Sequence, residues 1–458
     1  MTRIAQTHLA TLAVLTALIV GLAIPTSAAE RPNVILILAD DLAIGDLSCF
    51  NGGLSRTPRL DRLLEESVYF DRAYSGSPVC APSRAALLTG RYPHRTGSVT
   101  LNQQKFPHLT RLHLDETTIA DRFKASGYAT GLIGKWHSGP GADYHPLKRG
   151  FNEYAGFNDA TDVKTYFKYR LDIQGEYQEF DGPYLTDELT RRAVDFVQRH
   201  QSEPFFLHLA HYAPHRPLSA PQEIINRYLQ QELPEKTAKV YAMVEVLDAG
   251  IGVLLDELDR LRLAENTVVI FASDNGPDPL VGDRFNGDNR GTKYMINEGG
   301  IHVPLMVRWK SKLTSIRRNE VVHFTDLVPT LIEICNLRSP GTDKPLDGRS
   351  IAGLLSDAYA ASQLPTHRFW QWNRGTPIYS HNAAIREGDW KLVRPYVTRN
   401  IPHGESTAEA RLYDLKTDPN ESVDLADRQS ALRDRLLNKL EHWSNEVERD
   451  RLSPTRTQ

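Results

Sequence analysis

Cysteines, blocks of like charge and long apolar runs are all scarce in this sequence. Its 458 residues include only three cysteines, Cys49, Cys80 and Cys335. An exported protein that relies on disulfides usually carries more, in even number, so we predict no bridge between Cys49 and Cys335. The formal net charge is −3 and no block of consecutive like charges occurs. Nucleic acid is therefore not an expected partner. We find no internal repeat and no low-complexity segment.

Only one stretch approaches the length needed to cross a membrane. Arg3 precedes an uncharged apolar run over 9–24, and Pro25 and small residues at 26–29 follow. This order is typical of a secretory signal peptide, so we predict one over 1–29 and a protein that is periplasmic or secreted. The alternative is an uncleaved membrane anchor, for which the run is nearly long enough. After cleavage, no membrane partner is expected.

The rest of the chain predicts an α/β protein. Short apolar, β-branched runs alternate with amphipathic stretches, which is typical of a sheet covered by helices on both faces. The predicted strands are 34–38, 129–133, 205–209, 267–272 and 303–309. The predicted helices are 57–67, 82–88, 117–126, 185–198, 238–261 and 325–335. The length suits one large domain plus a smaller one.

The C-terminal part has a different sequence pattern. From about residue 364, short strand-like runs are separated by turns, and 432–448 has the pattern of one amphipathic helix. We therefore predict a large α/β domain over 30–360. A smaller α+β domain, a small antiparallel sheet plus a terminal helix, is predicted over 361–458.

Polar residues follow several predicted strands at the point where each strand ends. Asp40 and Asp41 follow the first strand, Gly134 and Lys135 the second, and Ser273, Asp274 and Asn275 the fourth; His211 and His215 come after the third. Ligands bind at the carboxyl ends of strands in open α/β sheets. These residues are therefore predicted to share one site.

The most specific motif is Cys80-Ala81-Pro82-Ser83-Arg84, followed by Leu88-Thr89-Gly90-Arg91. It resembles the signature of the type I, formylglycine-dependent sulfatases, where Cys-x-Pro-x-Arg is the site at which a maturing enzyme converts Cys to formylglycine. Further blocks match this arylsulfatase-like family in its order, over about 30–310: Asp40-Asp41, Gly134-Lys135-Trp136-His137, Pro214-His215-Arg216-Pro217, Ser273-Asp274-Asn275-Gly276, Arg290-Gly291-Thr292-Lys293 and Glu298-Gly299-Gly300.

The resemblance implies a fold, a metal and a maturation partner. The fold would be that of the alkaline phosphatase superfamily, a mixed central sheet flanked by helices. A Ca²⁺ ion would be held by the side chains of Asp40, Asp41, Asp274, Asn275 and the modified residue 80. Such oxygen ligands suit Ca²⁺, a hard cation, and nothing favours a soft metal such as zinc. The alternative is that each acidic pair sits in a solvated turn. The partner would be a formylglycine-generating enzyme.

By the same resemblance, Cys80 supplies the nucleophile. One hydroxyl of the hydrated aldehyde attacks sulfur to give a covalent sulfo-enzyme, and the other allows sulfate to be eliminated. Arg84 would orient the hydrate, since its planar fork suits pairs of oxygens. The alternative is that Cys80 is only a small buried hydrophobe, and Arg84 a surface ion pair.

Four further residues receive roles from the family pattern. Lys135 and Lys293 would bind the sulfate oxygens and offset transition-state charge. His137 would take a proton from the free hydroxyl, and His215, together with Lys293, would protonate the leaving alcohol. Outside such matched blocks each would more often be a solvated lysine or a structural histidine. His211 is a candidate lining residue, and Pro214 argues against a helix joining it to His215.

Two alternatives to sulfate-ester hydrolysis remain open at this stage. One is a metal-dependent phosphomonoesterase or phosphodiesterase on the same fold, which would usually carry Ser or Thr as nucleophile. The other is a non-catalytic protein that binds sulfated glycans, if Cys80 stays unmodified. The expected substrate is a sulfated glycan or a small aryl sulfate. Candidate specificity residues in the C-terminal part are Trp372, Asn373, Arg374 and His381. Ser138 and the 294–297 segment depart from the family pattern.

Overall fold

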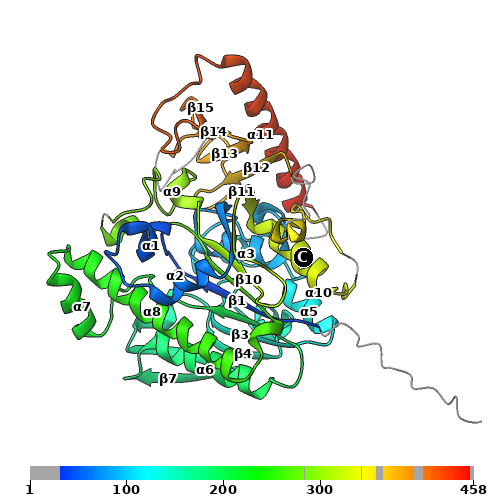
Figure 1. Ribbon diagram of the computed structural model, residues 1–458. Helices are drawn as coiled ribbons and strands as arrows, with labels where there is room; N and C mark the ends of the chain where they lie inside the picture. The colour runs from blue at the N-terminus through cyan, green and yellow to red at the C-terminus, as the bar shows by residue number, and fades with distance from the viewer. Residues whose placement is uncertain (1–30, 283, 342, 357–364, 397–405, 454–458) are drawn as a thin grey trace, which may run out of the picture. The chain divides into compact units, whose positions relative to one another are not determined.

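A large mixed sheet forms the centre of the protein (Figure 1). The computed structural model describes residues 31–282, 284–341, 343–356, 365–396 and 406–453. The strands of this sheet run in the order β11-β2-β10-β9-β1-β8-β3-β4-β6-β5, and β7 pairs with β6. Their bounds are β1 Asn33–Ala39, β2 Val68–Tyr74, β3 Ala129–Lys135, β4 Glu153–Phe157, β5 Val163–Thr165, β6 Lys168–Ile173, β7 Glu176–Asp181, β8 Phe205–Ala210, β9 Thr267–Ser273, β10 Leu305–Arg308 and β11 Ile316–His323.

Helices cover both faces of the sheet, because its central strands are apolar on both sides. On β1, Ile35 and Ile37 face the core shared with α2, α6, α7 and α8, whereas Val34, Leu36 and Leu38 face the core shared with α3, α5 and α10. The helix bounds are α1 Ser48–Asn51, α2 Pro58–Glu65, α3 Cys80–Thr89, α4 Pro93–Thr96, α5 Ile119–Ala125, α6 Leu185–Arg199, α7 Gln222–Leu229, α8 Glu235–Arg260, α9 Glu298–Ile301, α10 Leu327–Cys335 and α11 Ser430–Arg451.

Five neighbouring strands at the centre, β9, β1, β8, β3 and β4, are mutually parallel. Their carboxyl ends therefore meet at one edge of the sheet. β10 joins β9 in the antiparallel sense and makes the sheet mixed. The fold class predicted from the sequence is confirmed, and all five predicted strands and all six predicted helices are present with shifted ends.

A second, four-stranded antiparallel sheet lies in the C-terminal part, in the order β12-β13-β14-β15. Its strands are β12 His367–Gln371, β13 Ala383–Glu387, β14 Trp390–Arg394 and β15 Arg411–Asp414, and α11 packs against it. The predicted small sheet and terminal helix are thus found. The chain from Pro32 onward forms one compact unit. The predicted boundary at 360–361 lies outside the described residues and stays a prediction.

Several elements were not predicted. β2 and β11 carry charged residues along their length, such as Asp71 and Arg317, so they lack an apolar strand pattern. The β4–β7 segment and α7 were also missed. Within the described part of the chain, no helix combines the length and apolar character needed to cross a membrane. The predicted signal peptide at 1–29 lies outside the described residues.

Candidate active site

Two acidic segments meet where β1 and β9 end side by side. Ala39 pairs with Ser273 in the last register of the two strands, so the residues that follow them are neighbours. The Asp41 amide donates to Asp274 Oδ1 at 3.2 Å, and Asn275 Nδ2 donates to Asp41 Oδ1 at 2.7 Å. Asp40, Asp41, Asp274 and Asn275 are all buried. The sequence-based grouping of these four residues agrees with their placement.

Helix α3 brings Cys80 and Arg84 to the same place. Cys80 is the first residue of this buried helix, where the helix dipole favours negative charge. Its Sγ lies 3.3 Å from Asp40 Oδ1. Arg84, four residues later and so on the same helix face, reaches Asp274 Oδ2 from Nη2 at 2.8 Å and Asp40 Oδ2 at 3.2 Å.

Two lysines complete a ring of buried charge. Lys135, the last residue of β3, places Nζ 2.6 Å from Asp40 Oδ2. Lys293, from the loop before α9, places Nζ 2.6 Å from Asp41 Oδ1 and 3.3 Å from Cys80 Sγ. Gly134 precedes Lys135 with φ 106°, and a Cβ there would lie 1.9 Å from the Ala210 carbonyl oxygen. Only glycine therefore fits at this strand end.

The histidines differ in how close they come to this cluster. His215 Nε2 lies 3.6 Å from Asp41 Oδ2, and its Nδ1 contacts the Arg216 carbonyl oxygen at 2.6 Å. His137 Nδ1 is buried without a hydrogen-bond partner in the protein. His211 is fully buried, with both ring nitrogens unpartnered. Residues 211–217 form turns rather than a helix, as Pro214 predicted.

The charges in the cluster shift one another's protonation. Burial favours the neutral acid, but the cations around Asp40, Lys135 first among them, hold its pKa well below the usual range. Burial and then the charge of Asp40 raise the pKa of Asp274 to about 6. Burial also raises the pKa of the Cys80 thiol well above its usual value. As a thiol, Cys80 is therefore protonated and a poor nucleophile.

Burial lowers the pKa of both predicted proton-transfer histidines. That of His137 falls well below its usual value, with Lys135 adding to the effect of burial. That of His215 falls to about 4, and here Lys293 adds to burial. Both rings are therefore neutral near pH 7, so each offers an unprotonated nitrogen.

The oxygen atoms of the cluster fit a hard cation. Asn275 Oδ1 is buried and accepts no hydrogen bond within the protein, which leaves an acceptor next to three carboxylates. Asp40, Asp41, Cys80 and His215 also bring one ligand atom each to within 4.8 Å of one another. That set mixes sulfur and nitrogen with oxygen. We favour the set with Asp274 and Asn275 for a calcium ion, because Ca²⁺ prefers carboxylate and amide oxygens.

Two site residues have strained backbones. Asp41 and His137 adopt φ of 67° and 54°, in the left-handed region that residues other than glycine rarely occupy. Such strain persists where the surrounding structure holds it, and it concentrates at functional sites. The Asp41 carbonyl accepts a hydrogen bond from Arg284 at 2.9 Å, and Arg284 Nε donates to Asp46 Oδ1 at 2.7 Å. Sequence reasoning missed Arg284 and Asp46, which belong to none of the matched blocks.

Three of the C-terminal candidates, Trp372, Asn373 and His381, are buried. Trp372 is fully buried and packs at a tilt against Tyr294, which follows Lys293, with ring centroids 5.4 Å apart. Asn373 uses its amide oxygen within its own turn, accepting from the Gln371 side chain and the Ile378 amide. His381 is also buried and contacts the Tyr396 ring. Trp372 thus supports the Lys293 loop from behind, and the Ser138 hydroxyl is buried and turned to the Trp136 carbonyl.

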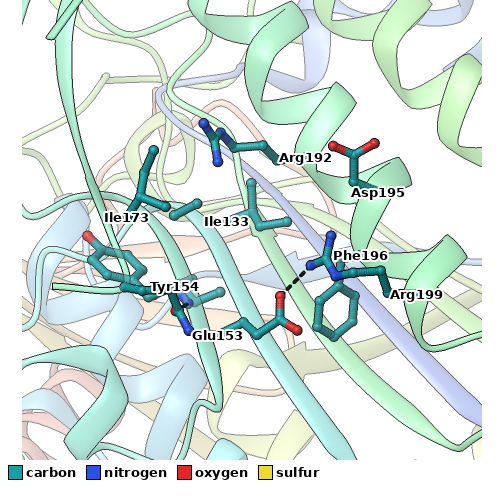
Figure 2. Close-up of a pocket in the computed structure, with 11 residues that line it drawn as sticks. Ile133, Glu153, Tyr154, Ile173, Arg192, Asp195, Phe196 and Arg199 are labelled. Carbon is teal, nitrogen blue, oxygen red and sulfur yellow. Dashed lines mark hydrogen bonds and ion pairs between the residues drawn. The ribbon is translucent and has the colours of Figure 1, made fainter. Parts of the chain in front are cut away.

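A cavity of about 250 Å³ lies between β3, β4 and α6 (Figure 2). Ile133 and Phe196 form apolar walls, and Glu153 pairs with Arg199 across one side. None of the predicted site residues lines it. Since Glu153 begins β4, this cavity lies away from the carboxyl ends of the strands.

Comparison with known families agrees with this geometry. The sulfatase family model matches residues 32–337, and the model of the N-sulphoglucosamine sulphohydrolase C-terminal region matches residues 291–446. The chain belongs to the sulfatase family. It is accordingly an enzyme, and the alternative of a non-catalytic glycan-binding protein is not supported.

Proteins of known sequence and of known structure resemble the chain over nearly its whole length. Arylsulfatase H of Homo sapiens is 30% identical, with 90% of each chain covered. N-acetylgalactosamine-6-sulfatase of Canis lupus familiaris is 30% identical over 87% of this chain and 82% of its own. The crystal structure of Ps i-CgsB in complex with k-i-k-neocarrahexaose superposes with a TM-score of 0.78, at 29% identity, covering 93% of this chain and 94% of that one.

Proposed function

We propose that this sulfatase-family enzyme hydrolyses a sulfate ester through a hydrated formylglycine made from Cys80, passing through a covalent sulfo-enzyme. One observation carries the proposal. Cys80 Sγ lies at the start of α3 and 3.3 Å from both Asp40 Oδ1 and Lys293 Nζ. In formylglycine, an oxygen bound to the Cβ of residue 80 in place of Sγ would lie next to both a carboxylate and a buried cation. The proposal requires a formylglycine-generating enzyme as partner, and export by the predicted signal peptide.

We assign Ca²⁺ to Asp40, Asp41, Asp274, Asn275 and the modified residue 80. When bound, the ion supplies a positive charge that polarises oxygens at the reacting centre. Three buried carboxylates here face three buried cations, Arg84, Lys135 and Lys293. The protein charge of the cluster is therefore balanced, and a divalent ion leaves it positive, as an anionic sulfate ester needs.

The cations of the chain bind and orient. Arg84 is held by Asp274 and by the Lys135 carbonyl oxygen, so its guanidinium is placed beside residue 80 to orient the hydrate. The Lys135 ammonium pairs with Asp40, and the Lys293 ammonium pairs with Asp41. We assign both to the sulfate oxygens, where fixed charge stabilises the negative charge that grows in the transition state.

The two histidines are assigned to the two proton transfers of the reaction. His137 has a buried, unpartnered Nδ1 and a depressed pKa, which suit a base that takes the proton of the free hydroxyl. His215 is assigned to the leaving alcohol, with Lys293 nearby through their common partner Asp41. The ring is neutral in the free site, so the positive charge on this side comes from Lys293, whose raised pKa keeps Nζ protonated and able to donate a hydrogen bond to the leaving oxygen.

The substrate class we propose is a sulfated carbohydrate. The relatives include one named for 6-sulfated N-acetylgalactosamine and a solved structure that holds a neocarrahexaose. Small aryl sulfates are the second expectation, since another relative is an arylsulfatase.

Peptide mass spectrometry tests the nucleophile. The protein is produced with a formylglycine-generating enzyme, and the tryptic peptide from Ala73 to Arg84 is examined for conversion of the thiol to an aldehyde. Turnover is then measured with calcium on aryl sulfates, N-acetylgalactosamine 6-sulfate, sulfated carrageenan oligosaccharides and the corresponding phosphate esters. An intact thiol, in cells where a known sulfatase is converted, would overturn the proposal. Faster turnover of phosphate esters would favour the phosphoesterase alternative.

A further inference from the structure

A cavity beside the proposed site carries the chemistry of a sugar-binding subsite. It has a volume of about 330 Å³ and opens between the 102–104 loop, the segments that follow β3 and β4, and the β6–β7 hairpin. We propose that this cavity binds an uncharged sugar ring linked to the sulfated one, so that the enzyme prefers an oligosaccharide whose neighbouring residue is neutral. This inference rests on the proposed function.

The cavity and the proposed site share the same strand ends. Lys135 pairs with Phe157 in the β3–β4 register, and the Trp136 amide donates to the Phe157 carbonyl. The His137 amide in turn donates to the Asn158 carbonyl oxygen at 2.8 Å. Trp136 and Asn158 line the cavity, whereas Lys135 and His137 belong to the site. The cavity therefore lies next to the proposed site, at the end of the neighbouring strand on the same edge of the sheet.

A pair of amide side chains in the cavity wall has unused hydrogen-bonding capacity. Asn158 Nδ2 donates to Gln103 Oε1. Gln103 is only 5% exposed, yet its Nε2 has no acceptor within the protein, and Asn158 Oδ1 has no donor. Buried amide groups are rarely left unpaired. Both atoms are enclosed in this structure, so a sugar hydroxyl, which can both donate and accept, would reach them once the two amide side chains turn toward the cavity.

The charge of the lining disfavours an anion. Among the described residues that line the cavity, the basic side chains are Arg170 and His145, and each is already paired. Arg170 Nε donates to Asp162 at 3.1 Å, and His145 Nε2 contacts Asp172 at 2.9 Å. Asp159 adds a further carboxylate to the wall. A second sulfate or a uronate would therefore meet more negative than unpaired positive charge.

An exposed aromatic ring stands at the rim. Tyr177 is 58% exposed, and the Arg170 guanidinium lies 4.3 Å from its ring centroid. A ring held by a cation in this way is pre-oriented, so a sugar can pack on it at little entropic cost.

Three probes with one common sulfated sugar test the inference. They are the sulfated monosaccharide that the matured enzyme hydrolyses fastest, its disaccharide with a neutral sugar, and its disaccharide with a uronate. We expect the matured wild-type enzyme to give about tenfold higher kcat/KM on the neutral disaccharide than on the monosaccharide. The uronate disaccharide should show no such gain.

Variants locate the effect. Gln103→Ala and Tyr177→Ala should lose the gain on the neutral disaccharide, chiefly through KM, and keep monosaccharide turnover unchanged. Tyr177 is exposed, so its replacement tests the cavity without disturbing a buried contact. Gln230→Ala, at an exposed position after α7, is the matched control and should keep the gain.

The outcomes separate the two proposals. Equal kcat/KM on the monosaccharide and the neutral disaccharide, or a gain that both variants retain, would overturn the subsite while leaving sulfate hydrolysis intact. A larger gain on the uronate disaccharide would also overturn it. Failure to hydrolyse any sulfate ester, with an aldehyde present at residue 80, would overturn the proposed function and the subsite together.

Discussion

Four separate segments of the chain supply the charged residues around Cys80. Asp40 comes from the end of β1, Asp274 from the end of β9, Lys135 from the end of β3 and Lys293 from a loop. Each of these ions is buried, and a buried ion is costly unless an opposite charge faces it. The lysines and carboxylates therefore stabilise one another, and the site is a set of paired charges rather than independent residues.

Replacing the lysines tests their assignment to the sulfate oxygens. We expect Lys135→Ala and Lys293→Ala each to lower kcat by about 10²–10³, because a preorganised donor of this kind contributes about 3–4 kcal/mol to transition-state stabilisation. Steady-state kinetics with an aryl sulfate measures the change. Lys164→Ala, at an exposed position on β5, should have no effect. A drop of less than threefold at both site lysines would contradict the assignment.

Calcium binding can be checked through Asn275, whose Oδ1 is the unpartnered acceptor. A chelator should lower the Tm of the wild-type protein, because a ligand bound only to the folded state at about 100 times its Kd adds about 2.7 kcal/mol. Asn275→Ala should need a higher calcium concentration to recover the same Tm. Asn226→Ala, on the exposed side of α7, is the control. If calcium leaves the Tm of both proteins unchanged, the metal assignment is wrong.

At the scale of elements, the site depends on how strand ends and loops are held. The parallel strands supply the residues, and the C-terminal sheet supports the Lys293 loop from behind. Asn382, just before β13, is fully buried and joins the two. Its Nδ2 donates to the Tyr294 carbonyl at 2.7 Å, and its Oδ1 accepts from the Ile296 amide at 3.2 Å. Tyr294 itself adopts φ 82°, so this loop needs such support.

Removing the Asn382 side chain should therefore loosen the Lys293 loop. We expect Asn382→Ala to cost about 2 kcal/mol or more in the free energy of unfolding, since buried backbone groups lose their partners. kcat should fall while calcium affinity stays within about threefold. Urea unfolding and kinetics measure these effects.

Asn336→Ala provides a matched control for this change. Asn336 also adopts a left-handed conformation, with φ 49° against 46° for Asn382, but it caps α10 at an exposed position. It should carry the same backbone penalty without the kinetic effect. Equal kinetics for the two variants would show that the loop does not depend on Asn382.

At the scale of the whole molecule, buried ion pairs join the two sheets. Glu298 begins α9, next to the Lys293 loop, and accepts from Lys391 of β14 at 2.8 Å and from the Tyr74 hydroxyl of β2 at 2.6 Å. Glu421 meets the same Lys391 at 3.0 Å. The sequence places Glu298 in a family block, but its partners lie far away along the chain.

This junction should make stability depend on pH. Burial would raise the pKa of Glu298, but Lys391 and Arg386 outweigh it and lower the pKa to about 2, against an ordinary value of 4.5. Because the folded pKa is depressed, the stabilisation is fully present above pH about 4.5 and is lost as the pH falls toward 2. The free energy of unfolding, measured by urea at several pH values, should decline over this window.

Glu298→Gln separates this effect from general acid denaturation. The variant should lose about 3 kcal/mol at pH 7, where it leaves Lys391 with Glu421 alone, and should show a shallower decline below pH 4.5. Glu65→Gln, at an exposed position on α2, should follow the wild-type curve. Parallel curves for the wild type and Glu298→Gln would contradict the assignment.

Local pattern was enough to predict much of this protein. Buried parallel strands read as continuous apolar runs, so β1, β3, β8 and β9 were predicted. The structure brings Asp40, Asp41, Lys135 and Asn275 at their ends together, whereas His211 makes no hydrogen bond to this group. The Cys80–Arg84 motif predicted the family. β2 and β11 were missed because charged residues interrupt their apolar pattern, and most of β11 is only partly buried or exposed.

The sequence by itself determined the apolar central strands, the family and which residue types are available for chemistry, because these depend on neighbours within a few positions. Only the tertiary structure decided which distant residues meet. Arg284 on Asp46, Glu298 on Lys391 and the Gln103–Asn158 amide pair each join segments that no local pattern connects. The physical reason is that strand order and loop packing set these contacts, and both are products of the whole chain folding at once.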